Sequence, residues 1–159
     1  MQKNLGFTLI ELTLIIIMLG ILAVAVVPKI LTSSGFEEYT YQDEMIVKLR
    51  AIQLRAMQQT SNNACQTIKL TSSSLGLLAT TPNASTCETN FARNTTTLTV
   101  DSAHNVSFSN TENLTSFSFS PLGRPLGCIS TTPCEVIFTL TGEKTLRVKI
   151  NSEGYVYAL

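Results

Sequence analysis

A single acidic residue lies within an otherwise uncharged apolar segment near the start of the sequence. From Phe7 to Val27 there are 21 residues, and Glu11 is the only one with an ionisable side chain. Cleavage between Gly6 and Phe7 would give Phe7 a free α-amine four residues before Glu11. A carboxylate at that spacing can neutralise this amine or the amine of a neighbouring helix, and the N–H groups of a helix N-terminus also favour it. The pattern predicts charge pairing at a newly made N-terminus.

The four cysteines all follow this segment, at positions 65, 87, 128 and 134. Such a distribution is typical of disulfides formed in an oxidising compartment. Three pairings are open, and we expect Cys65–Cys87 and Cys128–Cys134 because pairing nearest neighbours closes the shortest loops. The spacings contain no C-x-x-C pair and His104 is the one histidine, so a zinc site is poorly supported. We expect His104 to lie in a surface loop.

Other catalytic patterns are not found in the sequence. We identify no Ser/His/Asp grouping, no Gly-rich phosphate loop and no paired acids, and we therefore expect neither an enzyme nor a bound cofactor or metal. The 11 basic and 11 acidic residues balance. Only 12 of the 99 residues from Ser61 to Leu159 are charged. This balance gives no electrostatic reason to expect nucleic acid as a partner.

The apolar segment is long enough for a membrane-spanning helix. At about 1.5 Å per residue, its length is roughly 31 Å, which matches the hydrocarbon core of a bilayer. Glu11 lies in the first turns, where its carboxylate can stay close to the membrane interface. The alternative is an ordinary single-span anchor or an ordinary secretory signal, for which Ala23-Val24-Ala25 is a nominal cleavage site after the apolar core.

A second helical pattern continues to about Gln59, and the helix can bend at Pro28 and Gly35. At 100° per residue, one apolar face is expected to pack against a sheet. Its members are Tyr41, Met45, Ile46, Leu49, Ile52, Ala56 and Met57. Glu44 and Lys48 form a favourable i,i+4 pair away from that face. A narrower apolar line is either incidental surface or a contact with neighbouring subunits: Val47, Ala51 and Leu54.

Beyond Thr60 the hydrophobic period changes from 3.6 to 2, which is typical of antiparallel strands and hairpins. Apolar residues alternate with polar ones at 68–70, 98–100, 106–108, 117–119, 136–140, 146–150 and 155–157. Turns are predicted at 141–144 and 151–154, and loops at 82–94 and 123–133. A disulfide in each loop would compensate for the little core that it buries. The predicted fold class is α+β, with a long N-terminal helix packed on a β-rich head.

The start of the chain resembles the class III signal of type IV pilins and type II secretion pseudopilins. The resemblance depends on Lys3 in a short leader, then Gly6, Phe7 and Glu11, followed by the uncharged segment. In that family a membrane peptidase cuts after the Gly and N-methylates the new terminal Phe. The Glu pairs with the N-terminal amine of an adjacent subunit during assembly. The resemblance implies these roles for Gly6, Phe7 and Glu11.

The C-terminal part resembles the GspH/FimT-type minor pilins, through Phe119–Pro125 and Leu146–Gly154. That family has a long N-terminal helix under a β-rich head, and its members occur at low abundance in pili or secretion pseudopili. Some members bind DNA through a Gly-Arg-x-Arg motif in the last hairpin. Here the corresponding stretch is Gly154-Tyr155-Val156-Tyr157, without arginine. We therefore do not expect nucleic acid as a partner, because phosphate contacts need Lys or Arg.

These resemblances imply a pilin fold in four parts. They are a leader at 1–6, the transmembrane and assembly half of the helix at 7–27, its amphipathic half at 28–60, and the head at 61–159. The family's helical Gly and Pro, near which filament pilins can lose helicity, correspond to Gly20 and Pro28.

The function implied is that of a minor pilin of a type IV pilus. A prepilin peptidase would process it, and one span would hold it in the bacterial inner membrane with its head in the periplasm. An inner-membrane assembly platform would then place it in or near the tip of an extracellular filament, where its helix contacts major and minor pilins. A subunit of a periplasmic type II secretion pseudopilus, and a tip subunit that binds DNA or a surface, are the alternatives.

Overall fold

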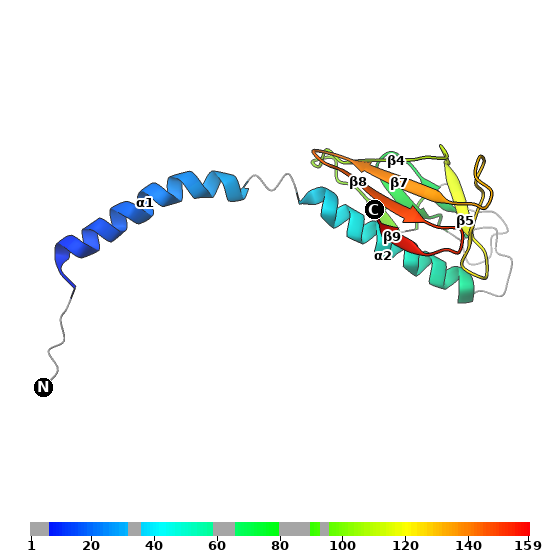
Figure 1. Cartoon of the computed structure of the whole chain (residues 1–159), viewed down its shortest axis with the longest axis horizontal. Coiled ribbons are helices and arrows are strands. Elements are labelled where there is room, and N and C mark those ends of the chain that lie inside the picture. The colour runs from blue at the N-terminus through cyan, green and yellow to red at the C-terminus, as the bar shows by residue number, and fades with distance from the viewer. Residues whose placement is uncertain (1–6, 32–35, 59–65, 80–89, 93–95) are drawn as a thin grey trace, which may run out of the picture. The chain divides into compact units, whose positions relative to one another are not determined.

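The computed structural model describes residues 7–31, 36–58, 66–79, 90–92 and 96–159 (Figure 1). The chain divides into two compact units, Met1–Ser34 and Gly35–Leu159. The first contains helix α1 (Leu9–Leu31), and the second combines helix α2 (Glu37–Gln58) with nine strands among the described residues. The predicted long helix is thus described as two helices, and Gly35, where a bend was predicted, lies outside the described residues.

Helix α1 is composed almost entirely of apolar residues. The large apolar side chains from Phe7, just before the helix, to Val24 are between 43% and 81% exposed. The helix contains both Gly20 and Pro28 and continues to Leu31. Among the described residues, no helix meets the length and apolarity needed to cross a membrane. The membrane-spanning helix therefore stays a prediction.

Helix α2 packs one face against strands of both sheets of the head (Figure 1). Of the seven residues predicted for this face, four are buried and two are half-buried against the core: Met45, Leu49, Ile52 and Ala56, then Tyr41 and Ile46. The prediction for Met57 is wrong, since this side chain is 44% exposed. It lies in the last turn of α2, beyond the packed part of the face, and its sulfur sits beside the turn at Gly123.

Two antiparallel sheets form the rest of the head. The first has the strand order β3-β2-β1-β5-β6. Its strands are β1 (Ile68–Leu70), β2 (Ser74–Leu77), β3 (Thr97–Thr99), β5 (Ser116–Phe119) and β6 (Pro125–Leu126). The second has the order β4-β7-β8-β9. Its strands are β4 (Ser107–Asn110), β7 (Val136–Thr141), β8 (Thr145–Ile150) and β9 (Val156–Ala158).

The predicted hairpins are confirmed at the C-terminal end. Strands β7 and β8 pair in register from Thr141↔Thr145, which places the turn at the predicted residues. Strand β8 then pairs with β9 across the turn at 151–154. Alternate residues of β7 are buried, and the side chains that point inward meet α2 in one core. Within it the rings of Phe117 and Phe138 lie 5.7 Å apart.

Two strands were not predicted. In β2 all four residues are buried. Its sequence, Ser74-Leu75-Gly76-Leu77, has only two large apolar residues and a glycine in its interior, which weakens a strand pattern. Gly76 permits this burial, because a Cβ there would lie 2.8 Å from the Thr96 carbonyl oxygen. Strand β6 falls inside the predicted loop 123–133. It has two residues, begins with Pro125 and lies at the edge of its sheet, where proline is tolerated.

Candidate functional site

The N-terminal residues that were predicted to carry the chemistry lie at the start of α1. Phe7 is 75% exposed and Glu11 is also exposed, in the first turn of the helix. Gly6, the predicted cleavage position, lies outside the described residues. Glu11 thus lies on the surface of its unit, four residues after Phe7, and its charge pairing stays a prediction.

Thr8 caps this helix, which the sequence reasoning missed. Its side-chain oxygen accepts the backbone N–H of Glu11 at 3.3 Å, and its carbonyl accepts the N–H of Leu12 at 3.2 Å. These contacts satisfy one of the donors that a helix N-terminus leaves open. Thr-x-x-Glu is the sequence signature of a capping box, so the signal was present at Thr8 and Glu11. This bond uses the backbone N–H of Glu11, and the charge pairing of its carboxylate stays a prediction.

A buried carboxylate joins helix α2 to the turn between β7 and β8. Glu38 is 2% exposed, and its Oε1 accepts the N–H of Glu143 at 2.6 Å and that of Lys144 at 3.2 Å, in the β7–β8 turn. Its Oε2 has no hydrogen-bond partner among the described residues. A Cβ on Gly142 would collide with Oε1, so glycine is needed for this approach.

The pKa of Glu38 follows from these contacts. Burial alone would raise it, because a buried carboxylate is poorly solvated. The backbone N–H groups of Glu38, Lys144 and Glu143, together with the positive charge of Lys144, outweigh burial and hold the pKa below its ordinary value. Glu38 is therefore charged at neutral pH and binds the turn as a carboxylate.

A second polar residue of α2 holds two other turns. The side-chain amide of Gln53 donates to the Gly123 carbonyl at 2.6 Å and to the Gly154 carbonyl at 2.7 Å. Both glycines have positive φ, +80° and +90°, a region that other residues avoid. A Cβ on Gly154 would also collide with the Gly123 carbonyl. Gly123 and Gly154 each lie in one of the two stretches that resemble minor pilins, and both accept a hydrogen bond from Gln53.

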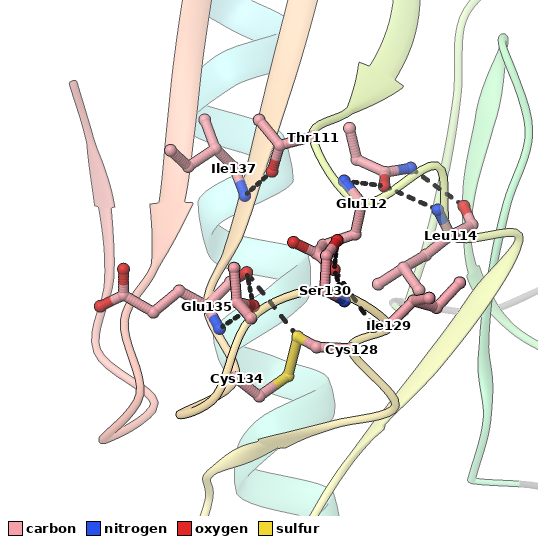
Figure 2. Close-up of a disulfide and its surroundings, with 11 residues drawn as sticks. Thr111, Glu112, Leu114, Cys128, Ile129, Ser130, Cys134, Glu135 and Ile137 are labelled. Atoms are coloured by element: carbon pink, nitrogen blue, oxygen red, sulfur yellow. Dashed lines mark hydrogen bonds between the residues drawn. A yellow bond between two sulfur atoms is a disulfide. The ribbon is translucent and has the colours of Figure 1, made fainter.

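The Cys128–Cys134 disulfide is confirmed, with its Cα atoms 5.3 Å apart (Figure 2). It closes the loop between β6 and β7. At the end of the loop, the hydroxyl of Thr131 accepts the N–H of Glu135 at 3.2 Å. Cys65 and Cys87 lie outside the described residues, so their pairing stays a prediction.

His104 lies in the loop between β3 and β4, as predicted, but it is only partly exposed. Its Nδ1 is 3.2 Å from a carboxylate oxygen of Glu37 and 3.3 Å from the hydroxyl of Tyr41, both on α2. Its ring also makes an edge contact with that of Tyr41. The histidine therefore joins a loop to the first turns of α2. In the described part of the chain, no group of three or more His, Cys, Asp or Glu residues could hold a metal ion.

The two tyrosines of the last hairpin stack on each other, with ring centroids 5.4 Å apart. Tyr155 is 62% exposed. Opposite Tyr157 on β8 lies Lys149, whose ammonium is 2.9 Å from the carboxylate of Glu135, the residue that precedes β7. The hydrogen bond to Glu135 raises the pKa of Lys149. Lys149, the residue opposite Tyr157, is thus already paired with Glu135.

Comparison with known proteins identifies the fold. No protein-family model matches the sequence, and no curated protein matches it. Two crystal structures of the type IV minor pilin FimU of Pseudomonas aeruginosa strain PAO1 are similar in structure. One, in space group P21, has a TM-score of 0.54 and 12% identity over 77% of this chain and 88% of the FimU chain. The other, in P65, has a TM-score of 0.51 and 10% identity over 76% and 91%.

The chain therefore has the fold of a type IV minor pilin, which confirms the predicted pilin fold. At identities of 12% and 10% the likeness concerns the fold alone. It does not reach the finer assignment to the GspH/FimT type.

Proposed function

We propose that this chain is a minor pilin, a structural subunit of a type IV pilus. The observation that carries the proposal is the coincidence of two independent features. One is the fold similar to that of FimU, which is a type IV minor pilin. The other is the pattern Gly6-Phe7 with Glu11 at the start of a long apolar helix. The fold supports the class of protein, and the N-terminal pattern supports assembly through the helix.

Processing would supply the chemistry of the N-terminus. A prepilin peptidase would hydrolyse the Gly6–Phe7 peptide bond and N-methylate the α-amine of Phe7. The exposed carboxylate of Glu11 would then pair with the N-terminal amine of an adjacent subunit. The chain is the substrate in this step and carries out no catalysis itself.

Helix α1 would occupy two apolar surroundings in turn. Before assembly it would anchor the subunit in the inner membrane, with the head in the periplasm. After extraction by the assembly platform, the same surface would pack against the helices of neighbouring pilins. One surface suits both states because lipid tails and packed apolar helices are comparably apolar. The all-round exposure of apolar side chains from Phe7 to Val24 supports this exchange.

The particular filament is a finer proposal. The C-terminal pattern is similar to the GspH/FimT type. The stretches 35–41 and 49–54 are similar to the minor pilin of mannose-sensitive haemagglutinin pili, so we place the subunit in an adhesion pilus. A type II secretion pseudopilus is the alternative. Genes for pilus assembly or for a secretion channel beside the coding sequence would distinguish the two.

A substitution at Glu11 tests the proposal. We expect Glu11→Ala to be processed but to be largely absent from sheared filaments, because the amine of the neighbouring subunit loses its countercharge. Glu44→Ala is the matched control, since it removes an acid that pairs with Lys48 on the head. Incorporation of Glu11→Ala at the wild-type level would refute the assembly role.

Gly6→Val should accumulate as uncut precursor, and normal processing of it would exclude Gly6 as the cleavage position.

A further inference from the structure

The disulfide loop is held at its middle as well as at its ends. Glu112, in the turn between β4 and β5, receives three hydrogen bonds at Oε2 (Figure 2). The donors are the N–H of Ile129 at 3.1 Å, the N–H of Ser130 at 2.7 Å and the hydroxyl of Ser130 at 2.8 Å. Glu112 itself is 6% exposed. A carboxylate distant in sequence thus binds two consecutive residues at the centre of the loop.

The position of Glu112 does not depend on the loop. The side-chain oxygen of Asn110 accepts the N–H of Glu112 at 3.2 Å and that of Leu114 at 2.8 Å. Its side-chain nitrogen donates to the Leu114 carbonyl at 2.9 Å. The backbone N–H of Thr111 donates to the carbonyl of Ile137 on β7 at 3.0 Å. These hydrogen bonds fix the backbone of the turn and, with it, the position from which the Glu112 carboxylate reaches the loop.

The disulfide and the carboxylate constrain different features of the loop. The disulfide joins residues six apart and limits the distance between the ends. In the chain-entropy view, so short a loop gains less stability from cross-linking than a longer loop does. Three hydrogen bonds on one charged oxygen fix the backbone at Ile129 and Ser130 directly, and bonds to a charged group are the stronger kind. The disulfide bounds the loop, and Glu112 selects its conformation.

We propose that the Cys128–Cys134 loop is an acid-sensitive conformational switch, in which the Glu112 carboxylate holds the loop in one shape and its protonation releases the centre. Ile129 is 78% exposed at that centre, so the switch controls how an apolar side chain is displayed on the head.

The pKa of Glu112 is lowered, as expected for a carboxylate whose charged form the loop stabilises. The N–H and hydroxyl of Ser130 lower it below its ordinary value of 4.5, and they outweigh the opposing effect of burial. A carboxyl whose pKa is lower in the folded state stabilises that state fully above its ordinary pKa. The contribution is lost as the pH falls through the lowered value. Glu135, which follows Cys134 at the end of the loop, pairs with Lys149 at 2.9 Å.

NMR of the full chain in detergent micelles tests the proposal through the amide signals of Ile129 and Ser130. In Glu112→Gln we expect their hydrogen exchange to accelerate about tenfold, since the bonds lose their charge. In the double variant Cys128→Ser/Cys134→Ser we expect exchange at these amides to stay within about threefold of wild type. Glu153→Gln is the control, because it removes an exposed acid that pairs with Arg124.

An acid titration of the wild type gives a second measurement that needs no variant. The two amide signals should move together below pH 4.5, while the amides of β7 and β8 stay constant. Loss of protection in the double cysteine variant with retention in Glu112→Gln would overturn the proposal. So would amide signals of Ile129 and Ser130 that do not change with acid before the head unfolds.

Discussion

Helices α1 and α2 have nearly equal lengths, 23 and 22 residues, but their side chains face opposite surroundings. In α1 the described large apolar side chains are exposed on every side, from 43% upward. In α2 one face is buried against two sheets, and the rest is largely polar. Helix α2 therefore obtains its apolar surroundings from its own chain, whereas the described residues do not cover the apolar side chains of α1.

The polar contacts of the two helices differ in the same way. In α1 the hydrogen bonds of Thr8 and Thr13 reach residues only three positions away. In α2 Glu38 and Gln53 reach turns between 70 and 106 residues away. A change in α2 should thus alter the stability of the head, and a change in α1 should alter only the helix or its assembly.

The largest expected effect comes from the apolar face of α2. Leu49 is fully buried, so Leu49→Ala should lower the free energy of unfolding of the head by about 2–5 kcal/mol. Leu19→Ala in α1 is the matched control, since Leu19 is 60% exposed, and should change the head by less than about 0.5 kcal/mol. Guanidinium denaturation of the full chain in detergent, followed by near-ultraviolet circular dichroism, measures both. Equal losses of free energy of unfolding in the two variants would contradict the expected difference between the helices.

Glycine to alanine substitutions should have opposite signs in the two units. Gly154→Ala introduces a Cβ at positive φ and into the Gly123 carbonyl, so we expect a loss of about 2–4 kcal/mol in the same assay. In α1 a Cβ on Gly20 meets nothing within 4 Å. Gly20→Ala should therefore strengthen the isolated helix by about 0.5–1 kcal/mol, seen as greater helicity in detergent. A head that tolerates Gly154→Ala would contradict the role of this close approach.

The sequence was informative where periodicity determines structure. Six of the seven residues predicted for the face of α2 pack against the core, and strands such as β7 and β8 followed from alternation alone. Strand β2 was missed because it is short and has a glycine in its interior, and β6 because two residues cannot show a period.

The polar contacts could not be read from the sequence. Nothing in the sequence singles out Glu38, because its partners, the N–H groups of Glu143 and Lys144, are more than 100 positions away. Glu112 is equally inconspicuous in the sequence. Such sites depend on backbone groups brought together by topology, and backbone groups leave no residue-specific signal. The cap at Thr8 is different, because its partner is local and its signature is in the sequence.

A smaller effect is expected from the buried carboxylate of α2. Glu38→Gln keeps the shape but removes the charge that the turn N–H groups bind, and should lower the free energy of unfolding by about 1–2 kcal/mol. The wild type should lose the same contribution as the pH falls below 4.5, because the pKa of Glu38 is lower in the folded state. The variant should lack this part of the pH dependence. Glu11→Gln in α1 should leave the unfolding of the head unchanged at every pH.

The smallest effect concerns the start of α1. Thr8→Ala removes the oxygen that accepts the N–H of Glu11, and loss of such a cap typically costs about 1 kcal/mol of helix stability. Because the contact is local, the loss should appear as fraying of the first turn, measured by faster amide exchange at Leu9 to Glu11 in micelles, with head unfolding unchanged. Thr8→Ser keeps the oxygen and should behave as wild type. Protection of these amides in Thr8→Ala equal to that in Thr8→Ser would show that the surroundings of α1, and not its cap, fix where the helix begins.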